Sequence, residues 1–148
     1  MNKLGWFFTG LAVIVALGIW AVLKQPVPTQ TNTPTDQQDQ TDLGIQIDSP
    51  VQNATVGSPL TVTGQAKGNW YFEAQFPVEL RDANNNVVAS GAAHAQGDWM
   101  TENFVPFTTT LTWTATPATT TGYLYFKPDD PSGGANPNLP TLNWPVTF

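Results

Sequence analysis

Apolar and polar side chains alternate in a series of short runs from residue 43 to residue 148. In the first run, Ile45 and Ile47 alternate with Gln46 and Asp48. Successive side chains of a β-strand point to opposite faces of its sheet, so a period of two predicts strands with one buried face. The alternation assigns the following residues to buried faces: Ile45, Ile47, Leu60, Val62, Gly64, Ala66, Trp70, Phe72, Ala74, Phe76, Val78, Leu80, Val105, Phe107, Leu111, Trp113, Leu124, Phe126, Leu142, Trp144, Val146 and Phe148.

Segments rich in Pro, Gly, Asn, Asp and Thr separate these runs, at residues 49–59, 82–86, 116–122 and 128–140. The alternating runs between these turn segments, together with the run at 87–95, indicate about seven short strands. We therefore predict an all-β fold, an immunoglobulin-like two-sheet sandwich of about seven strands. A small barrel closed from adjacent hairpins is the alternative.

The stretch GNWYFEAQFPVELRD, residues 68–82, contains both large aromatic side chains and carboxylates. By parity, most of its aromatic residues fall on the buried face and its carboxylates fall on the opposite face. We predict one long strand here rather than the lip of an active site. Tyr71 is the exception, because it is an aromatic residue on the solvent face beside Glu73.

Residues 1–24 contain an apolar run, from Leu4 to Leu23, without a charged side chain. A helix of about twenty residues spans about 30 Å, the thickness of the hydrocarbon core of a bilayer. Trp6 and Trp20 lie near the two ends of the run, where indole rings favour the membrane interface. We predict one uncleaved transmembrane helix with its N-terminus inside the cell; a cleaved signal peptide is the alternative.

Residues 25–42 are dominated by Thr, Gln, Pro and Asp and contain no aromatic side chain. Such a segment buries too little apolar surface to offset the entropy of ordering, so we predict a disordered tether. The predicted organisation is an anchor at 1–24, a flexible linker at 25–42 and the sandwich domain at 43–148. We expect the domain to lie on the extracytoplasmic side of the cell membrane.

Charged residues make up 11% of the chain, which carries a formal net charge of −6. Beyond the N-terminal segment, the cations are Lys67, Arg81 and Lys127. Nucleic acid is therefore not an expected partner, because phosphate recognition needs clustered Lys and Arg. The chain contains no cysteine, which excludes disulfides and thiolate metal sites.

The titratable residues do not form a catalytic pattern. Glu73 and Glu79 are roughly 20 Å apart on a regular strand, too far for a glycosidase carboxylate pair. Ser90 and His94 share a strand face but are about 13 Å apart. The single histidine, without cysteine, provides too few ligands for a zinc site. We predict no enzymatic activity, no cofactor and no metal.

Two oxygen-rich segments, residues 97–104 and 128–136, are weak candidates for calcium. Both lack the D-x-[DN]-x-[DN]-G pattern of a calcium loop. We instead predict turns that are stabilised by hydrogen bonds of their aspartates, with Asp98 capping the first turn. Trp99 is predicted to cover one end of the core.

Three tyrosines fall on the solvent face by parity, and they could form a platform for sugar stacking if their strands were neighbours. We predict docking to an envelope protein or a wall polymer as the main function. A carbohydrate- or cell-wall-binding module that uses the exposed tyrosines is the alternative. The candidate contact residues are Tyr71, Glu73, Trp99, Tyr123 and Tyr125.

Several motifs together resemble the immunoglobulin-like domain of bacterial spore-germination and sporulation proteins. They are Ser49-Pro50, Ser58-Pro59-Leu60 with Val62 and Gly64, WYFEAQFPVEL, GDWM, FVPF and the closing Pro145-Val146. The resemblance covers about residues 45–148. It implies an extracytoplasmic, non-enzymatic sandwich, and the family provides no catalytic residues that could be assigned to this chain. Members of that family often lie beside a germination domain, whereas this chain has only the predicted anchor and tether.

Overall fold

The computed structural model describes residues 40–133 and 136–148. These residues form seven strands and one short 3-10 helix, η1, at Gly68–Trp70, and residues 40–43 are also helical. The all-β prediction and the predicted number of strands are both confirmed. The strands are β1 (Ile45–Ser49), β2 (Leu60–Lys67), β3 (Gln75–Asp82), β4 (Val87–Ala95), β5 (Phe104–Leu111), β6 (Thr121–Phe126) and β7 (Leu142–Thr147).

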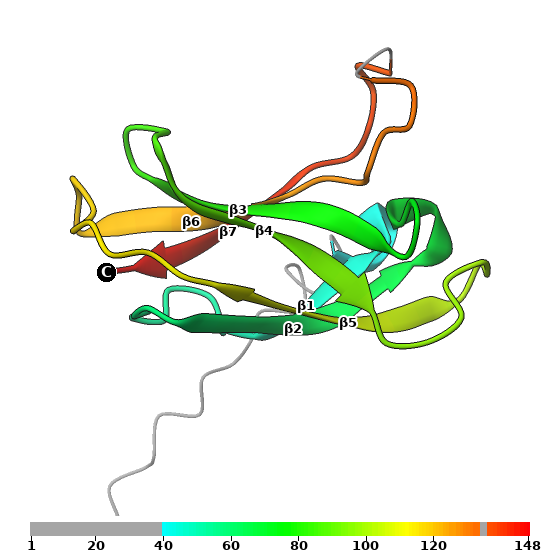
Figure 1. Ribbon diagram of the computed structural model, residues 1–148, viewed down its shortest axis with the longest axis horizontal. Coiled ribbons are helices and arrows are strands. Elements are labelled where there is room, and N and C mark those ends of the chain that lie inside the picture. The colour runs from blue at the N-terminus through cyan, green and yellow to red at the C-terminus, as the bar shows by residue number, and fades with distance from the viewer. Residues whose placement is uncertain (1–39, 134–135) are drawn as a thin grey trace, which may run out of the picture. The chain divides into compact units, whose positions relative to one another are not determined.

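All seven strands belong to one curled antiparallel sheet with the order β1-β2-β5-β4-β3-β6-β7. Figure 1 shows that β3, β4, β6 and β7 lie over β1, β2 and β5 as two facing layers. The layers are joined because β4 pairs with β3 along Val87–His94, while His94 and Ala95, at its end, also pair with β5. The fold is consistent with an immunoglobulin-like sandwich, although its two layers form one continuous sheet rather than two separate ones.

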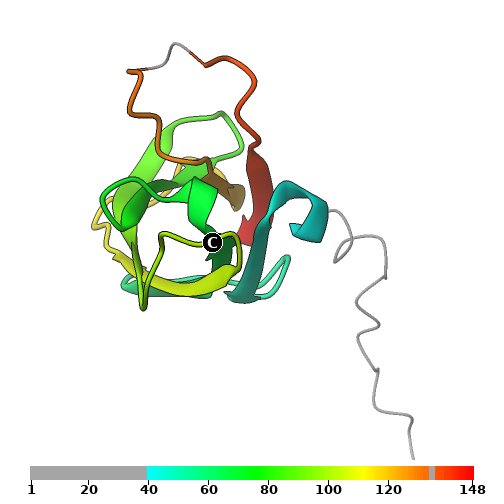
Figure 2. The ribbon, with the colours of Figure 1, turned by 90° about the vertical axis from the view of Figure 1, so that its right-hand side faces the viewer.

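The buried side chains of both layers form the core, and Figure 2 shows the backbone of the domain viewed along the strands. Its centre is a group of aromatic rings around Phe76, which is fully buried. The ring centroid of Phe76 lies 5.6 Å from that of Trp70, 5.2 Å from that of Tyr71 and 5.0 Å from that of Phe107, all in edge-to-face arrangements. Such pairs add about 0.5–1.5 kcal/mol each beyond the burial of their area.

The prediction of one long strand across residues 68–82 is wrong in its first half. The chain forms η1 at Gly68–Trp70 and then a tight turn, in which the backbones of Phe72 and Gln75 pair with each other. Glu73 and Ala74, the central residues of this turn, have φ values of 50° and 64°. Left-handed values at both central positions are typical of a type I′ turn. β3 begins only at Gln75. The alternation of buried and exposed positions therefore cannot be continued from β3 back through the turn to residue 68.

Two side chains are therefore on the opposite side from the one predicted. Tyr71, expected on the solvent face, is only 5% exposed, whereas Phe72, expected in the core, is 40% exposed. Beyond the turn the alternation holds, since Phe76, Val78 and Leu80 are all fully buried.

The free edge of β7 is covered by the connection between β1 and β2. Asn53 N donates to Pro145 O at 2.8 Å, and Val56 N donates to Thr147 O at 2.9 Å. Pro145 itself cannot donate to a ladder, which fits its place on an edge strand. Backbone groups of Pro145 and Thr147 on this edge are thus already hydrogen-bonded within the domain.

The edge of β1 is covered by residues 40–43, which are helical. Ile47 N donates to Gln40 Oε1 at 2.9 Å, and Gln40 is buried although it falls within the predicted linker. Trp70 Nε1 donates to Leu43 O at 3.0 Å, which connects this segment to η1.

The predicted anchor at 1–24, and the part of the predicted linker up to residue 39, lie outside the described residues. Among residues 40–133 and 136–148, no helix is long and apolar enough to span a membrane.

Candidate functional site

The candidate residues from the sequence are distributed over three parts of the domain. Tyr123 and Tyr125 are half-buried on the outer side of β6. Glu73 and Trp99 lie in connections, after η1 and between β4 and β5 respectively. Tyr71 belongs to the core. The structure therefore brings together only two of the three tyrosines.

Tyr71 is a structural residue rather than a contact residue. Its hydroxyl donates to Val105 O, on β5, at 2.7 Å. Burial raises the pKa of Tyr71 to about 12, from its usual value of 10.0. A ring in this position cannot stack on a ligand, so the expectation that Tyr71 forms part of a solvent-facing platform is wrong.

The Tyr71 hydroxyl leads to a prediction at alkaline pH. Between pH 10 and pH 12 the tyrosine ionises in the unfolded chain but stays protonated in the fold, so stability falls as the pH rises through this window. Tyr71→Phe should lower the free energy of unfolding by about 1 kcal/mol at pH 7, through the lost hydrogen bond. Urea titrations at pH 7, 10 and 12 measure the free energy of unfolding. The decrease in this free energy at alkaline pH should be smaller in Tyr71→Phe than in the wild type. Equal alkaline losses in the two proteins would count against the burial of this hydroxyl.

The outer side of the β4–β3–β6–β7 layer is where polar side chains converge. In the register of β3 and β6, Glu79 pairs with Tyr125, and Arg81 pairs with Tyr123. The strands that carry these residues are therefore neighbours, as the platform hypothesis requires. We call this surface the outer face: Gln75, Pro77, Glu79 and Arg81 of β3, Ser90, Ala92 and His94 of β4, Tyr123 and Tyr125 of β6, and Asn143 and Pro145 of β7.

Arg81 organises one half of the outer face. Its Nη2 lies 2.6 Å from Glu79 Oε2, and its guanidinium carbon lies 4.4 Å from the centroid of the Tyr125 ring. Its Nη1 donates to Asn85 Oδ1 at 2.8 Å, and the hydroxyl of Tyr123 donates to the same oxygen. The hydrogen bond to Glu79 raises the pKa of Arg81 further above its usual value. The result is a set of Tyr and Arg side chains whose positions are fixed before any partner binds.

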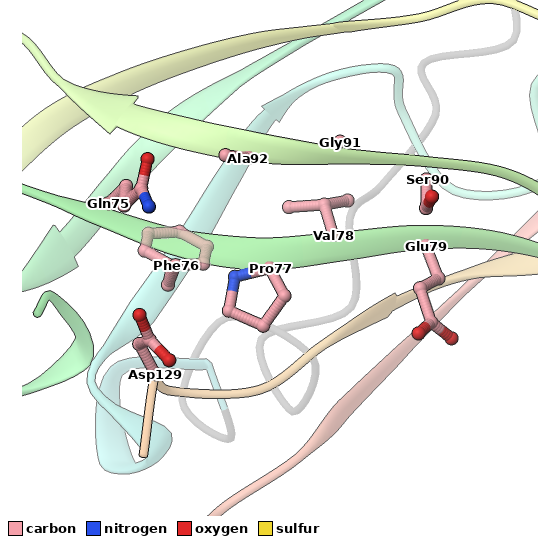
Figure 3. A pocket seen from close by; sticks show the side chains of 9 residues that line it. All are labelled: Gln75, Phe76, Pro77, Val78, Glu79, Ser90, Gly91, Ala92 and Asp129. Atoms are coloured by element: carbon pink, nitrogen blue, oxygen red, sulfur yellow. The ribbon is translucent and has the colours of Figure 1, made fainter. Parts of the chain in front are cut away.

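A groove occupies the other half of the outer face. One depression, of about 380 Å³, lies between β3 and β4, and a second, of about 510 Å³, lies between β3, the end of β6 and the connection to β7. The two depressions share Pro77, Glu79 and Asp129. Figure 3 shows the first depression, with Gln75 and Asp129 near one end and Ser90 and Glu79 near the other.

The groove forms because β6 stops pairing with β3 at Val78, opposite Phe126. The residue that precedes Val78 in β3 is Pro77, which has no N–H group to extend this ladder. The chain after β6 therefore leaves the sheet; it is the orange segment that projects beyond the strands in Figure 1. Asp129 N donates to Trp70 O at 3.0 Å, and this bond fixes the start of the segment against η1.

Several carboxylates of the described residues are engaged in turns or in an ion pair. Glu79 is bound by Arg81, and Asp98 Oδ1 accepts a hydrogen bond from Met100 N at 3.1 Å. Asp130 Oδ1 accepts one from Ser132 N at 2.9 Å. These Asx hydrogen bonds are the ones predicted for the two oxygen-rich segments. Within residues 40–133 and 136–148, no group of three His, Cys, Asp or Glu could hold a metal ion.

Glu73 lies in the turn between η1 and β3, and Trp99 lies in the connection between β4 and β5. Trp99 packs against the core while remaining partly exposed, as predicted for a residue that covers one end. The backbone around Trp99 packs tightly against Gly68, and Met100 beside it is 77% exposed. Glu73 lies on the solvent-exposed turn, so the two residues do not belong to the outer face.

The sequence analysis did not single out Arg81, Asn85 or Pro77 as site residues. Arg81 and Glu79 are two positions apart in an alternating run, which places both on one face and could have indicated their ion pair. Asn85 offers no such signal, because its contact with Tyr123 joins residues that are distant in the chain. Asp129 was considered only as a weak calcium ligand, and its position in the groove depends on the connection after β6.

A model of the family described as the immunoglobulin-like domain of bacterial spore germination matches residues 44–135. This range includes β1 to β6, and it agrees with the resemblance found in the sequence motifs. The comparisons with curated proteins and with solved structures gave no match.

Proposed function

The chain belongs to the family of immunoglobulin-like domains of bacterial spore germination, and from this membership we propose that it is a non-catalytic docking module of the cell envelope. Residues 1–24 anchor it in the membrane, and the segment from residue 25 to residue 39 tethers the domain on the extracytoplasmic side. The outer face binds another envelope protein. Family membership supports the link to germination; the docking role is supported by the chemistry of the outer face.

The observation that carries this proposal is the fixed cluster of Arg81, Tyr123 and Tyr125. Tyrosine and arginine are enriched among the residues that dominate protein interfaces. These side chains stand on paired strands and are already ordered by ion-pair, ring and hydrogen-bond contacts. A partner that binds here meets little entropic cost for ordering them.

Two features argue against a sugar or an anionic wall polymer as the main ligand. Arg81 covers the ring of Tyr125, which a sugar would need for stacking, and Tyr71 is not available. The net charge of −6 also repels an anionic polymer at a distance. A protein surface is the ligand class that suits a preordered Tyr and Arg cluster.

The docking proposal can be tested by crosslinking the full-length protein in cells and purifying it from solubilised membranes. We expect a discrete partner protein to be recovered with the wild type and at least about tenfold less with Tyr125→Ala, since a hot-spot residue contributes about 2 kcal/mol or more. Thr61→Ala is the matched control, because Thr61 is exposed on β2, in the opposite layer. Thermal unfolding of both variants checks that each is folded.

Recovery of glycan without protein would support the carbohydrate-binding alternative instead. Equal recovery of the partner with Tyr125→Ala and with the wild type would remove the outer face from the proposal. The anchor is tested separately: deletion of residues 1–24 should release the protein from the membrane fraction, and retention there would contradict it.

A further inference from the structure

We infer that the groove beside Pro77 takes an extended, basic segment of the partner protein, with a Lys or Arg side chain at Asp129. This inference rests on the proposed docking function and names the chemistry of the partner. It concerns the part of the outer face beside the Arg81 cluster, with which the groove shares Glu79 and Tyr125.

The dimensions of the groove suit a length of polypeptide rather than a single side chain. Its two depressions have volumes of about 380 and 510 Å³, and each lies within the range of about 300–1,000 Å³ that is typical of ligand sites. They share Pro77, Glu79 and Asp129, so they are continuous across β3. A segment that fills both depressions must be extended, because it crosses from the β4 side of β3 to the β6 side.

The walls of the groove determine the side chains that fit. Ser90 and Ala92, on the β4 side, have small side chains that leave the backbone of the sheet close to the surface, and Pro77 and Leu139 provide apolar contacts. Pro77 has no N–H, so the segment cannot be held by a continuous backbone ladder at this point. Its side chains must therefore provide most of the recognition.

The charge of the groove selects a basic segment. Glu79 already has Arg81 as its ion-pair partner. Asp129 accepts a hydrogen bond from Asp130 N and forms no ion pair among the described residues. The first depression is lined by both carboxylates and by no cationic side chain, and the lining of the second adds the carboxylate of Asp130 and one cation, Lys127. A cationic side chain beside Asp129 would complete a charge-assisted hydrogen bond, and the net charge of −6 would favour its approach.

The test is a calorimetric and NMR titration of the full-length protein in neutral detergent micelles. The probe is an acetylated and amidated hexapeptide of alternating Lys and Val, and the control peptide has Glu in place of Lys. We expect saturable binding of the Lys peptide. The largest changes in amide chemical shift should occur at Ser90, at Asp129 and at the residues on either side of Pro77. Asp129→Asn should raise the Kd about tenfold, equivalent to about 1.4 kcal/mol, whereas Asp48→Asn, an exposed change on β1, should leave the Kd unchanged.

Three results would overturn the inference: equal affinity for the Lys and Glu peptides, shift changes outside the groove, or the same Kd in Asp129→Asn and the wild type. Absence of saturable binding would overturn it as well. The inference and the proposed function fail in different ways. If crosslinking recovers a partner but the Lys peptide does not bind, the docking function stands and the basic segment is wrong. If the Lys peptide binds but no partner is recovered, the docking function fails.

Discussion

Replacing Phe76 with alanine is expected to lower the free energy of unfolding by about 3–5 kcal/mol, which is a large part of the stability of an ordinary domain. Phe76 is fully buried, and its ring contacts those of Trp70, Tyr71 and Phe107. Alanine would remove all three edge-to-face pairs and leave a cavity between the layers. Urea denaturation followed by tryptophan fluorescence measures the loss.

Phe72→Ala is the matched control, because it removes the same side chain four positions earlier in the sequence. Phe72 is 40% exposed on the turn before β3, so the expected loss is within about 1 kcal/mol. The comparison also tests the position of the turn directly. If the two variants lost similar amounts of stability, residues 68–82 would be the single strand that parity suggests, and the observed turn would be wrong.

Gly68→Ala is expected to have the second largest effect, a loss of about 1–3 kcal/mol or more. A Cβ atom at Gly68 would lie 2.0 Å from Thr101 O and 2.3 Å from Trp99 O. Both neighbours are backbone atoms, so the connection between β4 and β5 would have to move away from η1. Differential scanning calorimetry should show a lower Tm, and the fluorescence of Trp99 should shift as the loop is displaced.

Gly57→Ala provides the control for the extra methyl group and the loss of backbone freedom. Nothing lies within 4 Å of a Cβ atom built at Gly57. We therefore expect its Tm to stay the same or to rise slightly, since alanine reduces the entropy of the unfolded chain. A Tm for Gly68→Ala as high as that for Gly57→Ala would show that the loop does not pack against η1 as described.

The strands could be predicted from the sequence because their pattern is local. Each strand buries one face, so alternation in β2, β5 and β7 identifies both the element and its inward side chains. Leu60, Val62 and Ala66 on β2, for example, are all buried as predicted. The joining of the two layers was not predictable in this way, because it depends on how β4 divides its pairing between β3 and β5.

Parity failed between residues 68 and 74 for a specific physical reason. Alternation identifies a face only while the chain stays extended, and η1 and the turn at Glu73 and Ala74 both interrupt the extended backbone. Turn signals were also absent from the sequence. Type I′ turns favour Asn-Gly, whereas this turn uses Glu73 and Ala74, two residues that rarely adopt positive φ.

The candidate site was only partly predictable because its contacts join strands that are distant in the chain. Alternation correctly placed Tyr123 and Tyr125 on the outer side of β6. It could not show that Arg81 would cover the ring of Tyr125, since this contact requires the register of β3 against β6. The groove depends on the course of the chain after Phe126, which follows no periodic pattern.

The covered margins of the sheet have a consequence for behaviour at high local concentration. Backbone groups of β7 bond to residues 53–56, and Ile47 of β1 bonds to the side chain of Gln40. Exposed strand margins are templates for fibre growth. Because residues 53–56 and Gln40 already occupy backbone groups of these two margins, copies crowded on one surface would meet through their side chains rather than by extending one another's sheets.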